Sequence, residues 1–401
     1  MNNYGIYKKL CENNNYSTLA KTLTSTASTE ATRKTIKRIT KSDITYAHMG
    51  QLVIKDGVCY ASFIQNPGTD TEYHYSKTSG VVLAKFDLNK IMSDDFNADN
   101  DVTIFPIGAM GDFCAGYKAI SIYKDNSMCL VGDLIYVCFS FIAEDENSHI
   151  FSKTFDTRTC EWIDEAKVAL KYKNKIYDFS DADINEIYTD KGLLPRAKGL
   201  IEMVSAWNEY NGEYYATALT IENANNGFIV KTTDFHTMEL VDTIPFNDMG
   251  MAEIASYVYK DRLFVACRQD YGIPYLYLSA LDLKKMRWEH AYRIPDANSR
   301  PWFCEYNNEL FLINTLDEKD RQYLNFSSIR VLEGWPQPFF YEQHPVKNLV
   351  TLKDCGSYIA TAKYNNEIYF VVTKDTESFG KLSLKIYDED KVNQKLLELF
   401  T

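Results

Sequence analysis

The chain has 401 residues and a formal net charge of −12 at pH 7, and 45% of its residues are hydrophobic and 14% aromatic. The excess of acidic over basic residues disfavours nucleic acid and anionic membrane surfaces as partners. No run of about 18 consecutive apolar residues predicts a membrane-spanning helix, so membrane insertion is not expected.

The first 43 residues are polar and rich in Ser, Thr, Asn and Lys, without an alternating hydrophobic pattern. We expect residues 1–43 to form a short polar arm outside the main domain, either disordered or used for attachment to a virion partner or for homo-oligomerisation. The segment also lacks the continuous apolar core of a signal peptide. This indicates synthesis in the cytosol, which is compatible with a virion component that acts outside the cell.

Six hairpin patterns follow, each made of two alternating hydrophobic runs joined by a short polar turn. They are LVIKDGVCYASF (52–63), CLVGDLIYVCFS (129–140), AWNEYNGEYYATAL (206–219), SYVYKDRLFVACR (256–268), CEYNNELFLIN (304–314) and AKYNNEIYFVV (362–372). Pairs such as Asp-Gly and Asn-Gly favour tight hairpin turns. Further strand patterns at 81–91, 228–241, 275–291 and 382–390 supply outer strands.

The later hairpins recur roughly every 50 residues, which is typical of propeller blades. We therefore predict an all-β fold, a six-bladed β-propeller over residues 44–401, with the functional site in the funnel at its axis. Three insertions interrupt the repeat, at 66–80, 92–116 and 163–199, and long loops on a β scaffold often carry binding function. The third contains a predicted short helix with Ser180 as its N-cap.

The nine cysteines include no CxxC pair. Most lie in apolar strand runs (Cys59, Cys129, Cys138, Cys267 and Cys304), where we expect buried free thiols rather than metal ligands. No metal and no cofactor is predicted.

From Glu253 to Tyr369 the chain resembles the sialidase (neuraminidase) superfamily, whose propeller blades carry Asp-box motifs. The matching elements, in order, are Glu253, Arg268, Gly272, the Ser279–Asp282 turn, Trp288, the run Asn298-Ser299-Arg300-Pro301 and Tyr358. An Asp-box-like turn also occurs at Lys231-Thr232-Thr233-Asp234. The resemblance implies a sialidase-like propeller and a retaining glycoside hydrolase that acts on an acidic or acetylated glycan.

The resemblance also implies a role for each residue. Tyr358 would be the nucleophile and Glu253 would take its proton, because a phenol with a pKa of about 10 is a poor nucleophile at neutral pH. Arg268 and Arg300 would bind an anionic group of the sugar with their planar guanidinium groups. Trp302 is the tryptophan expected to stack on the sugar.

Two departures from the family pattern bear on the substrate. His48 stands where sialidases carry the first arginine of their site, and we place it in the funnel because it opens a blade. The acid/base aspartate matches no motif; Asp70 and Asp112, on the two early insertions, are the candidates.

Two alternatives remain open at this stage. The chain could be a non-catalytic phage tail-fibre, receptor-binding or other virion structural protein, which the arm at 1–43 and the missing first arginine favour. A third hypothesis is a polysaccharide lyase, since some lyases combine a propeller with Tyr, His and Arg, and His48 and Tyr358 would then be its central pair.

Overall fold

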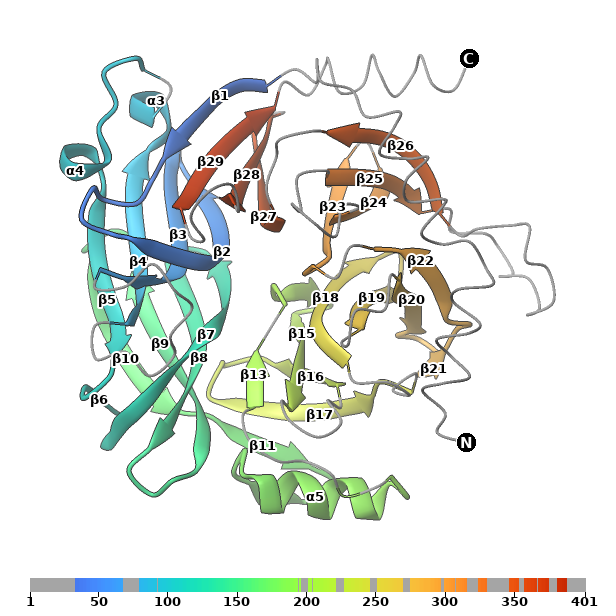
Figure 1. Ribbon diagram of the computed structural model, residues 1–401. Helices are drawn as coiled ribbons and strands as arrows, with labels where there is room; N and C mark the ends of the chain where they lie inside the picture. The colour runs from blue at the N-terminus through green and yellow to red at the C-terminus, as the bar shows by residue number, and fades with distance from the viewer. Residues whose placement is uncertain are drawn as a thin grey trace, which may run out of the picture.

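The computed structural model describes residues 33–387, with gaps at 68–78, 92, 194, 196–200, 204, 221–226, 246–250, 270–274, 297–298, 307, 316–323, 330–345, 353–356, 366 and 375–380. The described strands form six sheets around a common axis, in a β-propeller arrangement (Figure 1). The all-β fold class is confirmed, whereas the number of blades stays a prediction.

Each sheet is named here after a strand on its axial side. The β2 sheet contains β2 (Tyr46–Lys55), β3 (Val58–Asn66), β4 (Gly80–Asp87) and β5 (Thr103–Ala109). The β7 sheet contains β6 (Phe113–Cys114), β7 (Tyr117–Val131), β8 (Leu134–Ala143), β9 (Ser148–Asp156) and β10 (Glu161–Lys167). The short helices α3 (Leu88–Ile91) and α4 (Ala98–Asp101) lie between β4 and β5.

The third sheet is the largest. The β15 sheet contains β11 (Ala169–Tyr172), β12 (Lys175–Tyr177), β13 (Ile201–Met203), β14 (Asn208–Tyr210), β15 (Glu213–Thr220), β16 (Gly227–Thr232) and β17 (Thr237–Thr243). Its β11 strand pairs in parallel with β17, which attaches the insertion after β10 to the outer side of the sheet.

Three sheets complete the ring. The β18 sheet contains β18 (Met251–Tyr259), β19 (Arg262–Gln269), β20 (Tyr275–Asp282), β21 (Arg287–Trp288) and β22 (Tyr292–Pro295). The β23 sheet contains β23 (Trp302–Tyr306), β24 (Glu309–Thr315), β25 (Leu324–Ile329) and β26 (Val346–Leu352). The β27 sheet contains β27 (Ser357–Tyr364), β28 (Glu367–Lys374), β29 (Lys381–Tyr387) and β1 (Arg33–Arg38).

Strands near the axis connect neighbouring sheets into a closed circle. Strand β2 contacts β7, β7 contacts β13, β15 contacts β18, β18 contacts β23, β23 contacts β27, and β27 returns to β2. Residues far apart in sequence therefore meet where these strands begin, as the sequence predicted.

All six predicted hairpins are confirmed, because each is an antiparallel pair in the structure. Their turns use the left-handed backbone that the sequence favoured. In the first hairpin Asp56 and Gly57 have φ of 50° and 80°, and in the third Asn211 and Gly212 have φ of 55° and 81°. Two successive positive φ values match the right-handed twist of the flanking strands.

Aspartates also fix turns at the ends of outer strands. Asp234, in the Asp-box-like turn between β16 and β17, accepts hydrogen bonds from the backbone N–H groups of His236 and Thr237, both at 2.8 Å. Asp156 does the same for Arg158 at 2.8 Å, and hydrogen bonds from the side chain and backbone of Arg158 lower the pKa of Asp156 to about 2. Such bonds replace backbone pairing where a strand ends.

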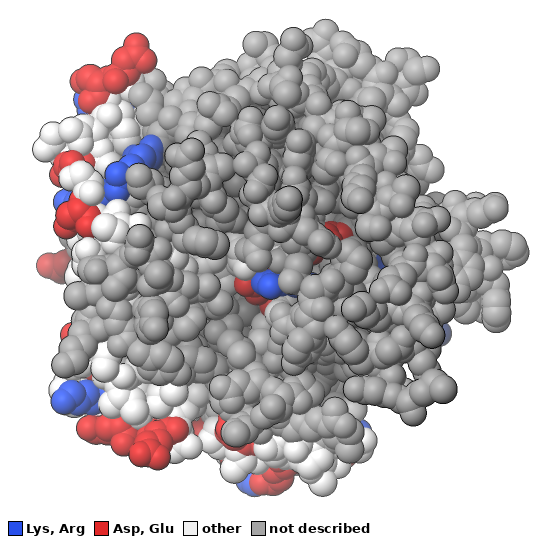
Figure 2. All heavy atoms as spheres, viewed as in Figure 1, with Lys and Arg blue, Asp and Glu red and all other residues white. Residues whose placement is uncertain are grey.

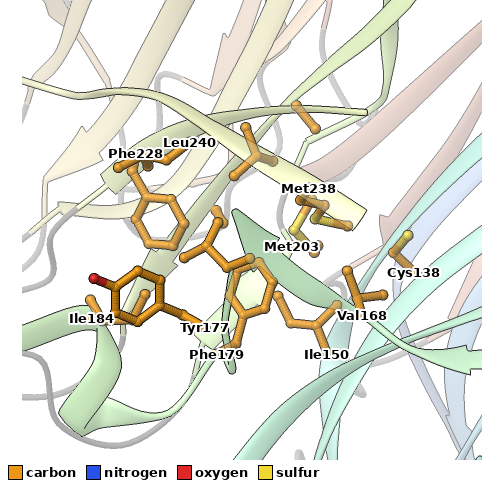
Figure 3. Packing of buried hydrophobic residues seen from close by; sticks show 14 of the residues in the cluster. Cys138, Ile150, Val168, Tyr177, Phe179, Ile184, Met203, Phe228, Met238 and Leu240 are labelled. Atoms are coloured by element: carbon orange, nitrogen blue, oxygen red, sulfur yellow. The ribbon is translucent and has the colours of Figure 1, made fainter. Parts of the chain in front are cut away.

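Apolar side chains fill the spaces between neighbouring sheets. Figure 3 shows the cluster between the β7 and β15 sheets, where Cys138 and Ile150 face Met203, Phe228 and the α5 helix. Helix α5 (Asp181–Asp190) is the predicted helix, and its N-cap is Ser180, whose Oγ accepts from the backbone N–H of Asp183 at 3.2 Å. Its buried residues, Ile184, Ile187 and Tyr188, attach the helix to this cluster.

The N-terminal boundary differs from the expectation. Arg33–Arg38 was placed in an arm outside the propeller, but it forms strand β1, which pairs antiparallel with β29. The next residue, Ile39, is fully buried in a cluster with Tyr369 and Val371. An early segment of the chain thus completes the last sheet, because β29 would otherwise present an unpaired edge.

We expect Ile39→Ala to destabilise the fold by about 2–5 kcal/mol, because it removes three buried carbon atoms and leaves a cavity. Urea unfolding measures this change. The control is Ile163→Ala on β10, where the side chain is 53% exposed and the expected change is within about 0.5 kcal/mol. Equal stability of the two variants would show that the segment before β2 does not support the fold.

The cysteines match their prediction. Among the described residues seven cysteines are present, none forms a disulfide, and the five in apolar runs are buried. Burial raises the pKa of the Cys59 and Cys129 thiols to about 12, so these thiols are unreactive at neutral pH. In the described part of the chain, no helix has the length and apolarity required to cross a membrane.

Candidate functional site

Three strands at the axis share one irregularity near their first residues. The register shifts between His48 and Gln51 in β2, between Ala252 and Ile254 in β18, and between Ser357 and Ala360 in β27. Each shift contains a non-glycine residue with positive φ: Met49 (58°), Glu253 (45°) and Tyr358 (52°). A bulge re-aims the side chains beside it, and such strained residues concentrate at functional sites.

The bulges bring three predicted site residues into direct contact. Arg268, from β19, forms an ion pair with Glu253. The same guanidinium nitrogen, Nη1, donates to the Tyr358 hydroxyl at 3.0 Å. Glu253 and Tyr358 are 6% and 5% exposed. A carboxylate and a phenol oxygen therefore share one cationic donor in a largely buried setting, where electrostatic interactions are stronger than in water.

His48, on β2, joins this cluster from the sheet next to that of Tyr358, because β2 contacts β27. Its imidazole lies 4.1 Å from the Tyr358 ring, centroid to centroid, with the planes tilted by 57°. The bulge at Met49 and the contact between β2 and β27 produce this approach. The placement of His48 in the funnel therefore agrees with its contact to Tyr358.

Arg300 lies just before β23 and is 2% exposed. Its Nη2 donates to the backbone carbonyls of Gly50 at 2.9 Å and Ile359 at 3.3 Å, next to the bulges of β2 and β27. Its guanidinium carbon also lies 5.1 Å from the centre of the Trp302 ring. Arg300 therefore links three sheets at the axis, a role that the motif alone did not indicate.

Trp302 is 6% exposed and its indole N–H donates to the Thr361 hydroxyl at 3.2 Å. Its ring supports Arg300 through a cation–π contact. It also lines a cavity that Tyr358, Glu253 and Arg268 do not line. The structure thus places Trp302 beneath the predicted site rather than beside Tyr358.

The candidate acid/base residues are Asp70 and Asp112, on the two early insertions. Asp70 lies outside the described residues. Asp112 follows β5 at the end of the β2 sheet where His48 also lies. It is exposed, and its carboxylate accepts from the backbone N–H of Ala109 at 2.9 Å. No contact joins Asp112 to the Tyr358 cluster among the described residues.

The sequence interpretation missed a polar support beneath the bulge of β2. Gln51 donates to the carbonyl of Asn126 at 3.1 Å, and Asn126 donates to the carbonyl of Met49 at 3.4 Å. Ser62 also donates to Asn126. The signal in the sequence is the polar stretch KDN (124–126) between the hydrophobic runs of the β7 strand.

The sequence interpretation also missed Asp296, which fixes the turn before Arg300. Asp296, which is 2% exposed, accepts from the backbone N–H of Ser299 and from the side chain of Asn314, both at 3.2 Å. These bonds fix the turn that precedes Arg300. A buried carboxylate needs such partners, but the sequence gives no sign that Asp296 is buried.

Charged side chains reach the surface near the axis. Figure 2 shows acidic and basic atoms close together near the middle of the face viewed in Figure 1. Within the described part of the chain, no group of three or more His, Cys, Asp or Glu residues could hold a metal ion.

Comparisons with known proteins gave results only for structure. No family model matches the chain, and no curated protein matches it. Solved structures do match. The Trypanosoma rangeli sialidase in complex with the inhibitor DANA aligns with a TM-score of 0.60 and 10% identity, over 93% of this chain and 61% of that chain.

Two further matches come from other sources. The phage phi92 endosialidase aligns with a TM-score of 0.56 and 11% identity, over 88% of this chain and 69% of that one. A Hadza microbial sialidase aligns with a TM-score of 0.57 and 10% identity, over 86% and 66%. The chain spans about three fifths of the length of the T. rangeli sialidase chains. At these identities the likeness shows the fold alone, and that fold is a sialidase-like β-propeller.

Proposed function

We propose that this chain is a six-bladed, sialidase-like propeller that binds a glycan at its axis and hydrolyses a glycosidic bond in an acidic or acetylated glycan. One observation carries the proposal: the Tyr358 hydroxyl and the Glu253 carboxylate both contact Nη1 of Arg268. In this interpretation each of the six sheets is one blade. The closed order of contacts from β2 through β27 supports that count.

The proposed reaction has two steps and retains the configuration of the sugar. First, the phenol oxygen of Tyr358 attacks the anomeric carbon while Glu253 takes the phenol proton. The glycosidic bond breaks, and its oxygen receives a proton from Asp70 or Asp112. In the second step water attacks the anomeric carbon and loses a proton to that aspartate. The bond to Tyr358 breaks, and the phenol recovers its proton from Glu253.

Arg268 has a positioning role in this scheme as well as a binding role. Its positive charge stabilises the phenolate that develops on Tyr358 and orients Glu253 toward it. The other proposed substrate contacts are Arg300 and His48, whereas Trp302, which was expected to stack on the sugar, contacts Arg300 and lines a cavity that Tyr358 does not line. A histidine in the place of an arginine lowers the positive charge available for a sugar carboxylate at neutral pH. Fewer cationic contacts for a carboxylate favour an acetylated glycan, or an acidic glycan that needs fewer such contacts, over a sialoside.

A second candidate function is a non-catalytic receptor-binding protein of a virion. The phage origin of one matched structure, the phi92 endosialidase, supports the virion part of this candidate. The non-catalytic part draws on Arg300, which is almost fully buried and whose Nη2 already donates to two backbone carbonyls. In this case the protein binds the glycan without cleaving it. The residues before β1 would then contribute contacts to a virion partner or to a homo-oligomer, and the protein would be made in the cytosol and act outside the cell.

The lyase hypothesis draws support from the ring contact between His48 and Tyr358. A lyase removes a proton from the sugar ring and leaves an unsaturated product, whereas a hydrolase consumes water and leaves a saturated sugar. The ultraviolet absorbance of the unsaturated product separates the two. A screen of the wild-type protein against sialosides, uronic-acid oligosaccharides and acetylated glycans, with binding and products recorded separately, tests all three candidates.

Within this screen we expect Arg300→Ala to weaken glycan binding by about 2–5 kcal/mol, because truncating one partner of a desolvated charge pair leaves the other unpaired. Isothermal titration measures the change. Arg287→Ala is the matched control, since Arg287 is exposed on β21 and should leave affinity unchanged. Unchanged affinity in Arg300→Ala, with the fold intact by circular dichroism, would restrict Arg300 to linking the sheets.

A further inference from the structure

A cavity lies on the axis, on the other side of the bulges from Tyr358. Its volume is about 350 Å³, at the lower end of the range for small-molecule sites. Strands β2, β7, β18, β23 and β27 all line it, together with the segment around Trp207. We call it the axial cavity.

The axial cavity is separate from the site proposed above. Along β18, Ser256 and Tyr257 line the cavity, three and four residues after Glu253. At about 3.3 Å per residue in a strand, this places the β18 part of the lining about 10 Å or more from Glu253. On β2 the lining begins at Gln51, where the register shift ends. Neither Glu253, Arg268, Tyr358 nor His48 is among the lining residues.

The cavity is lined by aromatic rings and aliphatic side chains, with fewer polar side chains. Five aromatic residues contribute to it, namely Trp207, Tyr214, Tyr257, Trp302 and Phe303, and aliphatic side chains form about half of the remaining wall. Glu209 lies at the exposed edge, and Glu305 accepts a hydrogen bond from the Tyr257 hydroxyl at 3.3 Å. Lys and Arg are missing from the described residues that line the cavity. The cavity therefore combines aromatic rings with negative charge.

The polar groups at the inner end are occupied within the protein. Asn208 donates to the carbonyls of Ala206 at 3.0 Å and Ser256 at 3.2 Å, and the Ser256 hydroxyl donates to Ser205 at 3.0 Å. Gln51 donates to Asn126. A sugar, with many hydroxyl groups, would find few partners for them, and an anion would face carboxylates.

We propose that the axial cavity binds a small organic cation with an apolar body, such as a quaternary ammonium group. Aromatic rings attract such cations through their negative faces, and the attraction increases when water is excluded. Trp302 already holds the Arg300 guanidinium 5.1 Å from its ring centre, so the rings left for a bound cation are those of Trp207, Tyr214 and Tyr257. Glu209, whose carboxylate also accepts from the backbone N–H of Gly212, supplies negative charge at the exposed edge of the cavity. Glu305 does not line the cavity, but its carboxylate accepts from the Tyr257 hydroxyl and adds negative charge next to the wall.

The test compares probes of the same shape and different charge. Choline, its neutral isostere 3,3-dimethylbutan-1-ol and the anion 3,3-dimethylbutanoate are titrated into the full chain at about 0.15 M salt, where long-range electrostatic attraction is screened. Binding is followed by two-dimensional NMR, using the indole N–H resonances of Trp207 and Trp302. We expect choline to bind at least about fivefold more tightly than the neutral isostere. Equal affinity for the two, or no shift with choline, overturns the proposal.

Variants locate the binding. Glu305→Gln and Glu209→Gln keep the shape of the side chains and should each weaken choline binding by about threefold or more, while binding of the neutral isostere stays the same. Trp207→Phe keeps an aromatic ring and should retain most of the affinity that Trp207→Leu loses. Melting temperatures confirm that each variant folds. Tyr358→Phe should leave choline binding unchanged; a loss there would place the cation in the glycan site and overturn the proposal.

Discussion

Replacing Tyr358 by phenylalanine should reduce glycan cleavage by at least about a thousandfold while leaving glycan affinity almost unchanged. The substitution removes one hydroxyl, which is the proposed nucleophile, and leaves the ring contact with His48 in place. Binding should weaken by no more than about 0.5–1.5 kcal/mol, the value of one hydrogen bond. Product formation and equilibrium binding are measured separately with the glycan class that the screen identifies.

Tyr210→Phe is the matched control for this experiment. The Tyr210 hydroxyl also makes one hydrogen bond, to Asp261 at 2.8 Å, but near a hairpin turn of the β18 sheet. The Tyr210→Phe variant should cleave and bind the glycan like the wild type. Undiminished product from Tyr358→Phe would rule out the proposed nucleophile, and glycan binding by the wild type without any product would favour the receptor-binding function.

Breaking the buried ion pair between Arg268 and Glu253 should be among the most destabilising single changes in the chain. Arg268→Met leaves Glu253, which is 6% exposed, as a buried carboxylate without its cation. Loss of one partner of a buried pair costs about 3–5 kcal/mol. Urea unfolding of Arg268→Met should therefore show a clear fall in the free energy of unfolding.

The double variant Arg268→Met/Glu253→Gln tests the cause of that loss. If the buried charge is responsible, the double variant should be more stable than Arg268→Met alone, because a neutral amide replaces the carboxylate. Both variants should be inactive in glycan cleavage, since both lack the Arg268 charge that orients Glu253 and stabilises the developing phenolate in the proposed scheme. A double variant less stable than either single variant would mean that side-chain packing, and not charge pairing, sets the stability of this cluster.

The hairpins were predictable because their signals are local. An alternating run fixes which side chains face the core, and a pair such as Asp56-Gly57 or Asn211-Gly212 fixes the turn. Helix α5 is similar, since Ser180 and the spacing of Ile184 and Ile187 identify its start and its buried face. These elements need no knowledge of distant contacts.

The candidate site was predictable only in part. The order of Glu253, Arg268 and Tyr358 indicated that they would meet, and in the structure Glu253 and Tyr358 both contact Arg268. The surroundings of Arg300 could not be predicted, because its carbonyl partner Gly50 lies 250 residues away in sequence. The same holds for Asn126, whose side chain supports the bulge of β2 across a sheet boundary.

The sequence by itself determined the repeating hairpins, the propeller arrangement and the residues that open its axial strands, because periodicity and turn chemistry act over a few residues. Only the tertiary structure decided how the ring closes and what the axis contains. The segment Arg33–Arg38 pairs with β29 through backbone hydrogen bonds, which leave no pattern in side chains. The axial cavity joins residues from strands up to about 300 positions apart, and their approach depends on the packing of whole sheets rather than on any local preference.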